Sequence, residues 1–132
     1  MEGQASFFYQ LLEHLSNEEA LIWEVLQEHR GKENAITHHK IAEQVGLNER
    51  LVRDRIKALT EEHRKPIGSL SGRGVFIITS LEERQEVLDF YRHHSLSLLR
   101  RMAILSGYNT GFLLGQLEID LQKLLEAPTK EN

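Results

Sequence analysis

Apolar residues recur at spacings of three and four along several stretches of the chain, which is the periodicity of amphipathic helices. The first stretch predicts an N-terminal helix within residues 1–16 and contains Phe7, Phe8, Leu11, Leu12 and Leu15. A second stretch begins after Ser16 or Asn17, either of which is a suitable N-cap, and ends at Gly31. The chain is therefore expected to open with two helices.

Two shorter helices are predicted next. Thr37 is a suitable N-cap for a helix over residues 38–45, and Gly46 can end it because glycine readily takes a positive φ. Asn48 is a suitable cap for another helix, which runs to about Arg64. This helix is amphipathic, with the apolar residues Leu51, Val52, Ile56 and Leu59 on one side and the polar residues Glu49, Arg50, Arg53, Asp54, Lys57 and Glu61 on the other.

The pattern then changes from that of helices to that of strands. Residues 67–70 and 75–79 are predicted to be strands, and the second is rich in residues that favour β-structure. The sequence between them is Ser71-Gly72-Arg73-Gly74, whose glycines suit the tight turn of a β-hairpin. We therefore expect a two-stranded hairpin with Arg73 near its tip.

A long helix is predicted after the hairpin, because Ser80 and Glu83 have the spacing of a capping box. Residues 107–110 interrupt this helix, and Thr110 is a suitable cap for a last helix. The two helices carry apolar rows, which consist of Leu88, Tyr91, Leu98, Met102 and Leu105 and of Leu114, Leu117, Leu121 and Leu124. These rows either fold back onto the rest of the chain or pair between chains. We expect a homodimer, because a domain of about sixty residues has too little surface to cover both helices.

Four segments follow from these patterns. They are an N-terminal helix, a central domain, a C-terminal helical dimerisation segment and a flexible tail, at residues 1–16, 17–80, 81–126 and 127–132. The predicted fold class is mainly α, with a three-helix core and a two-stranded hairpin in the central domain. The 132 residues leave room for one compact domain and one helical appendage.

The composition is that of a globular protein, with 40% hydrophobic and 27% charged residues. The absence of cysteine excludes disulfides, cysteine-based zinc sites and thiol catalysis. The acidic and polar start of the chain does not fit a signal peptide. The longest strongly apolar run, residues 75–78, is far shorter than the roughly 20 residues that span a bilayer. We therefore expect a soluble, cytoplasmic protein without a membrane partner.

The charge is distributed unevenly. Residues 30–73 contain ten Lys and Arg and six Asp and Glu, so this stretch carries +4 within a chain whose net charge is −4. The remainder therefore carries −8, and residues 1–29 contain six acids and no Lys or Arg. A basic middle between acidic ends can attract phosphates to one face of a protein and repel them elsewhere.

The residues from Lys40 to Leu59, KIAEQVGLNERLVRDRIKAL, contain a small Ala42 where two helices approach closely and Gly46 at the turn. This spacing lets two short helices cross steeply while the second exposes its outer face. With the hairpin that follows, residues 17–80 resemble the winged helix-turn-helix family. The run from Ile67 to Arg92 also looks like small winged-helix proteins of phages and prophages, in which a long helix follows the wing.

This resemblance implies sequence-specific binding to double-stranded DNA, as a transcriptional regulator that is associated with the nucleoid when bound. In the family, the second helix of the pair enters the major groove and the wing contacts the backbone or the minor groove. The residues that the resemblance assigns to DNA binding are Thr37, His38, His39, Lys40, Asn48, Glu49, Arg50, Arg53, Asp54, Lys57, Ser71 and Arg73. The backbone N–H groups of residues 37–39, at a helix start, suit a phosphate.

Each basic residue of this set suits a different part of the duplex. Arg50 and Arg53 suit guanine edges, because a guanidinium donates in a fork to O6 and N7. Lys40 and Lys57 suit phosphates, and Arg73 suits a narrow minor groove.

The sequence also departs from the family pattern. Leu51 stands where many relatives have threonine. Four acids in the same region would repel phosphate if they faced it, namely Glu49, Asp54, Glu61 and Glu62. Arg55 lies closer to the buried side, and we expect it to pair with Glu62 or with an acid of the N-terminal region.

Other classes of function find little support in the sequence. Seven histidines are present, but the adjacent pairs at 38–39 and 93–94 point about 100° apart on a helix, and no His-x-x-x-His spacing occurs. We expect no metal and no cofactor. No glycine-rich phosphate loop or nucleophile elbow is present, so we expect no enzyme. The alternative is a winged-helix protein-interaction module in a replication or recombination assembly, because the charge of −8 outside the centre suits a basic protein partner.

Overall fold

The computed structural model describes residues 15–107 and 111–126, and this part of the chain is mainly helical with one small antiparallel sheet. The chain divides into two compact units, residues 1–84 and 85–132. The predicted N-terminal helix lies almost entirely outside the described residues, as do its predicted apolar row before Leu15, the cap residue Thr110 and the tail from residue 127.

The first described helix, α2, spans Asn17–Leu26 and begins with a complete capping box. The Ser16 side chain accepts a hydrogen bond from the Glu19 N–H at 3.1 Å, and the Glu19 carboxylate accepts one from the Ser16 N–H at 2.9 Å. A short 3-10 helix, η1, follows at Lys32–Asn34. The capping box involves only residues close in sequence, which explains why the start of α2 could be predicted from the sequence.

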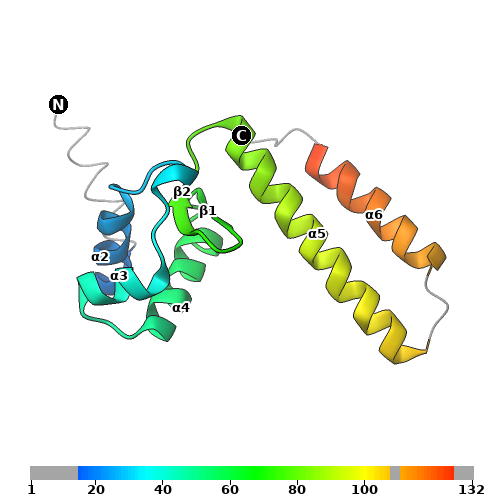
Figure 1. Ribbon diagram of the computed structural model, residues 1–132, viewed down its shortest axis with the longest axis horizontal. Coiled ribbons are helices and arrows are strands. Elements are labelled where there is room, and N and C mark those ends of the chain that lie inside the picture. The colour runs from blue at the N-terminus through cyan, green and yellow to red at the C-terminus, as the bar shows by residue number, and fades with distance from the viewer. Residues whose placement is uncertain (1–14, 108–110, 127–132) are drawn as a thin grey trace. The chain divides into compact units, whose positions relative to one another are not determined.

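The two short helices of the middle stretch are present (Figure 1), and each has the predicted cap residue. Helix α3 spans His38–Val45 and α4 spans Glu49–Glu61. Thr37 and Asn48 cap them, each accepting a hydrogen bond from a backbone N–H three residues further on. Gly46 ends α3 with a φ of 73°, as its position in the sequence predicts.

Helix α4 ends at Glu61, earlier than the predicted end near Arg64. Arg64 takes a φ of 54°, and the Lys65 N–H donates to the Leu59 carbonyl at 3.0 Å. The left-handed conformation of Arg64 and this hydrogen bond, which joins residues six positions apart, close the end of the helix. Pro66 explains the stop, because proline disfavours the helical conformation of the residue before it.

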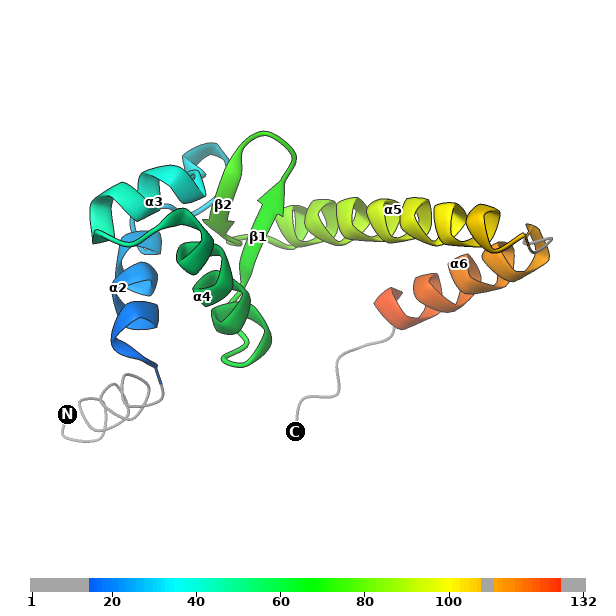
Figure 2. The ribbon, with the colours of Figure 1, turned by 90° about the horizontal axis from the view of Figure 1, so that it is seen from below.

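A β-hairpin consists of β1, Ile67–Leu70, and β2, Gly74–Ile77, with Ile67 opposite Ile77. The other edge of β2 pairs with the segment between α2 and α3. Ile36 and Val75 exchange two backbone hydrogen bonds, of 2.9 and 2.8 Å. Figure 2 shows the hairpin beside α3 and α4 within the first unit. The predicted strand at 75–79 therefore starts one residue earlier and ends at Ile77.

Close approach of two backbones requires glycine at the start of β2. Gly74 has a φ of 96°, and a Cβ atom built there would lie 2.3 Å from the Ile36 carbonyl oxygen. No side chain fits that space. The pairing of residue 36 with β2 therefore depends on this one glycine.

One apolar core joins α2, α3, α4 and the hairpin. The fully buried side chains among its members include Ile22, Leu26, Ile41, Val52 and Leu59. Ile56 of α4 is buried as predicted, whereas Leu51 is only half-buried. Because the apolar side of α4 is buried in the core, the opposite, polar side of the helix faces outward.

The second unit contains the long helix α5, Leu81–Ser106, from residue 85 onward, and α6, Gly111–Glu126. Gly107 follows α5 with a φ of 75°. Within this unit Arg92 donates a hydrogen bond to the Gln122 side chain. In the described part of the chain no helix is long and apolar enough to cross a membrane.

Candidate nucleic-acid interface

The turn between α3 and α4 fixes how the outer face of α4 is presented. The N–H groups of Gly46 and Leu47 both donate to the Ala42 carbonyl, at 2.9 and 3.2 Å. Ala42 is buried, so its small side chain permits the close approach of the two helices. Val52, Ile56 and Leu59 hold α4 in the core, and the predicted polar residues lie on the outside.

The basic residues on the outside of α4 differ in whether they have an ion-pair partner. Arg53 forms a 2.9 Å ion pair with Glu49, one turn earlier. Arg50 and Lys57 are exposed and have no ion-pair or hydrogen-bond partner among the described residues. Asp54 is exposed on the same face. Two cations of this face are therefore available to a ligand without first breaking a contact.

Arg55 has a different role. Its Nε donates to a Glu18 carboxylate oxygen of α2 at 2.9 Å, and both side chains are about one third exposed. The prediction that Arg55 pairs with an acid is confirmed, and the partner is the acid from the N-terminal region and not Glu62. This pair ties α4 to α2 and removes Arg55 from the candidate interface.

The start of α3 brings four predicted residues beside α4. The Thr37 hydroxyl accepts from the Lys40 N–H as the N-cap, and the Lys40 side chain is exposed without a partner in the described part of the chain. His39 is exposed and contacts Glu43 at 2.9 Å and Glu49 of α4 at 3.9 Å. Glu43 and Glu49 thus have partners at this surface, whereas the Asp54 side chain has none among the described residues.

His38, the first residue of α3, is half-buried. Burial lowers the pKa of its imidazole below the ordinary value, and the Arg53 charge lowers it further, whereas Glu49 acts in the opposite direction. The imidazole is therefore mainly neutral at pH 7. It offers a hydrogen bond to a ligand, not a fixed positive charge.

The hairpin tip contributes a further exposed cation. Ser71 and Arg73 are exposed, and the Arg73 N–H closes the turn on the Leu70 carbonyl at 3.2 Å. Arg73 also lines a shallow hollow of about 250 Å³ with Lys32, Glu33 and Ala35 of the η1 region. Sequence reasoning missed Lys32, because only the pairing of the 29–36 segment with β2 brings it to the hairpin.

Glu83 at the start of α5 holds the same region in place. Its carboxylate accepts hydrogen bonds from the Lys32 N–H at 2.9 Å and the Thr79 N–H at 3.0 Å. Desolvation raises the pKa of this carboxyl, but these bonds, the Thr79 hydroxyl and the Lys32 charge lower it more, so the net shift is downward. The Glu83 N–H donates to the Ser80 hydroxyl at 3.1 Å, which is one half of the predicted capping box. The Glu83 carboxylate instead accepts from the backbone of Lys32 and Thr79.

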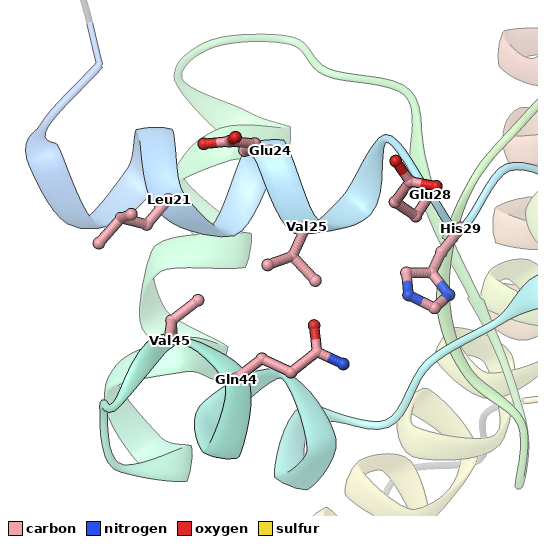
Figure 3. A pocket seen from close by; sticks show the side chains of 7 residues that line it. All are labelled: Leu21, Glu24, Val25, Glu28, His29, Gln44 and Val45. Carbon is pink, nitrogen blue, oxygen red and sulfur yellow. The ribbon is translucent and has the colours of Figure 1, made fainter.

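A groove of about 390 Å³ lies between α2 and α3 (Figure 3). Val25, Gln44 and Val45 point into it, and Glu24 and Glu28 lie along α2 and just after it. The remaining residues that line it are Leu21 and His29. The two carboxylates make this face unsuitable for phosphate, in contrast to the outer face of α4.

Three potential metal ligands meet between α2 and the end of α4. One atom each of Glu19, Glu62 and His63 lies within 4.8 Å of the others. The Glu19 carboxylate already accepts from the Ser16 N–H and lies 3.1 Å from His63 Nε2. Since Glu19 is the buried member of the trio, this contact explains how its charge is accommodated in the helix interface.

The residues predicted to mediate dimerisation lie in the second unit and are largely exposed. Tyr91, Leu98, Met102, Leu105, Leu117 and Leu124 are exposed, while Leu88 and Leu121 are half-buried. The Leu114 side chain lies outside the described residues. Most of the described members of this set are thus exposed to solvent.

No protein-family model, no curated protein and no solved structure matches this chain.

Proposed function

We propose that this protein is a winged helix-turn-helix protein that binds double-stranded DNA sequence-specifically and regulates transcription. The order of elements supports this: a helix, an extended segment paired with β2, two short helices joined by a tight turn, and a hairpin. In winged helices, the second helix of the pair enters the major groove and the hairpin contacts the neighbouring DNA. Here these elements are α4 and β1–β2.

One observation carries the proposal. Arg50 and Lys57 lie two turns apart on the exposed face of α4 and have no partner among the described residues. Opposite charges three or four residues apart on a helix attract each other. On α4 Arg53 forms such a pair with Glu49, whereas Arg50 and Lys57 form none with Asp54, although it lies four and three residues away from them. The unpaired cations suit an anionic ligand whose charges run along the helix.

In the proposed complex each side chain has a distinct contact. Arg50 donates to the O6 and N7 atoms of a guanine, and Lys57 and Lys40 contact phosphates. Arg53 joins the base contacts when it leaves Glu49, whose carboxylate can then accept from a cytosine amino group. Arg73 contacts the minor groove or its backbone from the hairpin tip. The proposal includes no catalytic step and no cofactor.

The test is a fluorescence anisotropy titration of duplex DNA at several salt concentrations, with selection of a preferred duplex from a random pool. We expect a log–log salt slope of about −3 to −6, which corresponds to roughly four to six neutralised phosphates. Lys57→Ala should weaken binding to every duplex and make the slope smaller in magnitude by about one. Arg50→Ala should reduce the preference for the selected duplex by about 1–3 kcal/mol.

The matched control removes the same charge elsewhere. Arg84→Ala and Lys123→Ala, both exposed and outside the candidate interface, should leave the salt slope and the sequence preference unchanged. Binding no tighter than about 10⁻⁴ M at physiological salt, or an equal loss in the control variants, would overturn the proposal. A protein-interaction module would then be the better explanation.

A further inference from the structure

Three side chains that the proposed DNA contact does not use meet where α2 lies beside the end of α4. They are Glu19 of α2, Glu62 at the C-cap of α4 and His63, the residue after it. One carboxylate oxygen of each glutamate and one imidazole nitrogen all lie within 4.8 Å of one another. Only packing brings residue 19 to residues 62 and 63, so the spacings along the chain, from which we expected no metal, did not reveal this trio.

The backbone holds all three residues in place. At the end of α4 the N–H groups of Glu62 and His63 both donate to the Ala58 carbonyl, at 2.9 and 3.2 Å. At the start of α2 the capping box with Ser16 holds Glu19. An ion that binds here would therefore not have to order a loop, which lowers the entropic cost of binding.

The Glu19 carboxylate has capacity for a further ligand. Its side chain is only 8% exposed, and Oε1 makes both of its contacts, with the Ser16 N–H at 2.9 Å and with His63 Nε2 at 3.1 Å. The other oxygen, Oε2, has no hydrogen-bond partner among the described residues. Since no fully buried side-chain oxygen in the described part of the chain lacks a partner, Oε2 is accessible to solvent. A hydrated cation can therefore reach it.

The charges around the trio favour a cation. Within the described ranges, neither Glu19 nor Glu62 forms an ion pair with a lysine or an arginine. Two carboxylates this close repel each other, and the repulsion is stronger where one of them is buried. His63, when protonated, balances one of the two negative charges, whereas a divalent cation balances both.

The ligand atoms select the class of ion. One imidazole nitrogen with carboxylate oxygens suits Zn²⁺ and related transition metals, whereas Mg²⁺ and Ca²⁺ take oxygen ligands. Bonds of about 2.0–2.1 Å in a tetrahedron place two ligand atoms roughly 3.3 Å apart, and Glu19 Oε1 lies 3.1 Å from His63 Nε2. Glu62 is exposed, so its side chain can rotate toward them. Water would fill the fourth position.

We propose that Glu19, Glu62 and His63 bind one divalent transition-metal ion, for which Zn²⁺ is the best match, and that this ion fastens the end of α4 to α2. Binding replaces the direct contact between His63 and Glu19, because His63 Nε2 coordinates only when it carries no proton. The ion adds to the Arg55–Glu18 pair, which joins the same two helices. The proposal concerns the stability of the first unit and does not depend on DNA binding.

Calorimetric titration of the full chain with ZnCl₂ is the first test, followed by thermal unfolding with and without Zn²⁺. We expect one ion per chain and a melting temperature that rises by several degrees. Glu62→Gln should weaken Zn²⁺ binding at least about tenfold and abolish the rise. Because Glu62 is exposed and has no partner among the described residues, this variant should keep the fold, as measured by circular dichroism without Zn²⁺.

The matched control is Glu61→Gln, which changes the neighbouring exposed glutamate outside the trio. It should bind Zn²⁺ as tightly as the wild type does. A wild-type Kd above about 1 mM, or an equal loss of affinity in the two variants, overturns the proposal.

Histidine side-chain NMR identifies the ligand among the seven histidines of the chain. With one equivalent of Zn²⁺ the ¹⁵N resonance of His63 Nε2 should shift, whereas the ring nitrogens of His93, exposed on α5, should not. Mg²⁺ at the same concentration should leave the His63 resonance unchanged. A His63 resonance that does not respond to Zn²⁺ overturns the proposal, even if the protein binds Zn²⁺ elsewhere.

Discussion

At the scale of single residues, Gly74 has the strictest requirement in the first unit. It has a positive φ, and a Cβ atom at this position would collide with the Ile36 carbonyl. We expect Gly74→Ala to lower the free energy of unfolding by about 2–4 kcal/mol, as expected for strain plus lost pairing. The measurement is urea denaturation followed by circular dichroism.

Gly72 provides the matched control for this substitution. It also has a positive φ, of 78°, but a Cβ atom there meets nothing within 4 Å. Gly72→Ala should therefore cost only about 1 kcal/mol, from conformation alone. Equal costs at the two positions would mean that the close approach of residue 36 to β2 does not contribute to stability.

His38 makes a separate prediction about pH. Because burial and the Arg53 charge hold its pKa below the unfolded value of 6.5, the unfolded chain binds more protons than the folded chain below that pH. Stability is therefore present above pH 6.5 and is lost as the pH falls through the folded pKa. His38→Gln should reduce the loss of stability between pH 7.5 and pH 5.5, measured by denaturation at both values.

The control for this prediction is His39→Gln. His39 is exposed, with 69% of its side chain accessible. The variant should keep the pH dependence of the wild type. If His39→Gln removed the dependence and His38→Gln did not, the burial of His38 would be the wrong cause.

At the scale of elements, Glu83 connects the start of α5 to the residues between α2 and α3. Its carboxylate accepts hydrogen bonds from the backbone N–H groups of Lys32 and Thr79. Glu83→Ala should lower the free energy of unfolding by about 1–2 kcal/mol. Glu82→Ala, an exposed neighbour in the same first turn, should have little effect.

The Glu83 contribution should also depend on pH in a defined direction. Its folded pKa lies below the ordinary value of 4.5, so the unfolded chain takes up protons first as the solution is acidified. The stability from this carboxylate is therefore complete above about pH 5 and is lost at lower pH. The difference between wild type and Glu83→Gln should shrink as the pH is lowered from 6 to 3, as measured by denaturation.

The elements that sequence predicted best are those with local signals. The starts of α2, α3 and α4 depend on Ser16, Thr37 and Asn48, whose capping contacts span only three residues. The outward face of α4 followed from the spacing of its apolar residues. The basic residues of the candidate site could therefore be named in advance, since they lie on that face.

The features that sequence did not predict depend on contacts between distant residues. Pairing of Ile36 with Val75 crosses about forty positions of the chain, and it brings Lys32 to the hairpin. No pattern of neighbouring residues predicts a pairing over such a distance in sequence. The sequence predicted that Arg55 pairs with an acid but left two partners open, and only the packing of α2 against α4 selects Glu18. It did not single out the pair of Arg53 with Glu49.

At the scale of the whole molecule, the two units should respond differently to protein concentration. If the second unit is completed by another copy, its melting temperature rises with concentration, while that of the first unit does not. Thermal unfolding followed by circular dichroism at about 5 and 200 μM should then resolve one transition that shifts. A single transition that is independent of concentration would contradict this.

The hydrogen bonding of β2 along both edges has a consequence for solubility during folding. Exposed strand edges are templates for aggregation between chains. Here the central strand is covered, and among the described strands only β1 has an outer edge, four residues long and directly preceded by Pro66. A short edge next to proline is poorly suited to recruiting a further strand. We therefore expect that the exposed hairpin does not pair with strands of other chains and does not promote the growth of fibres.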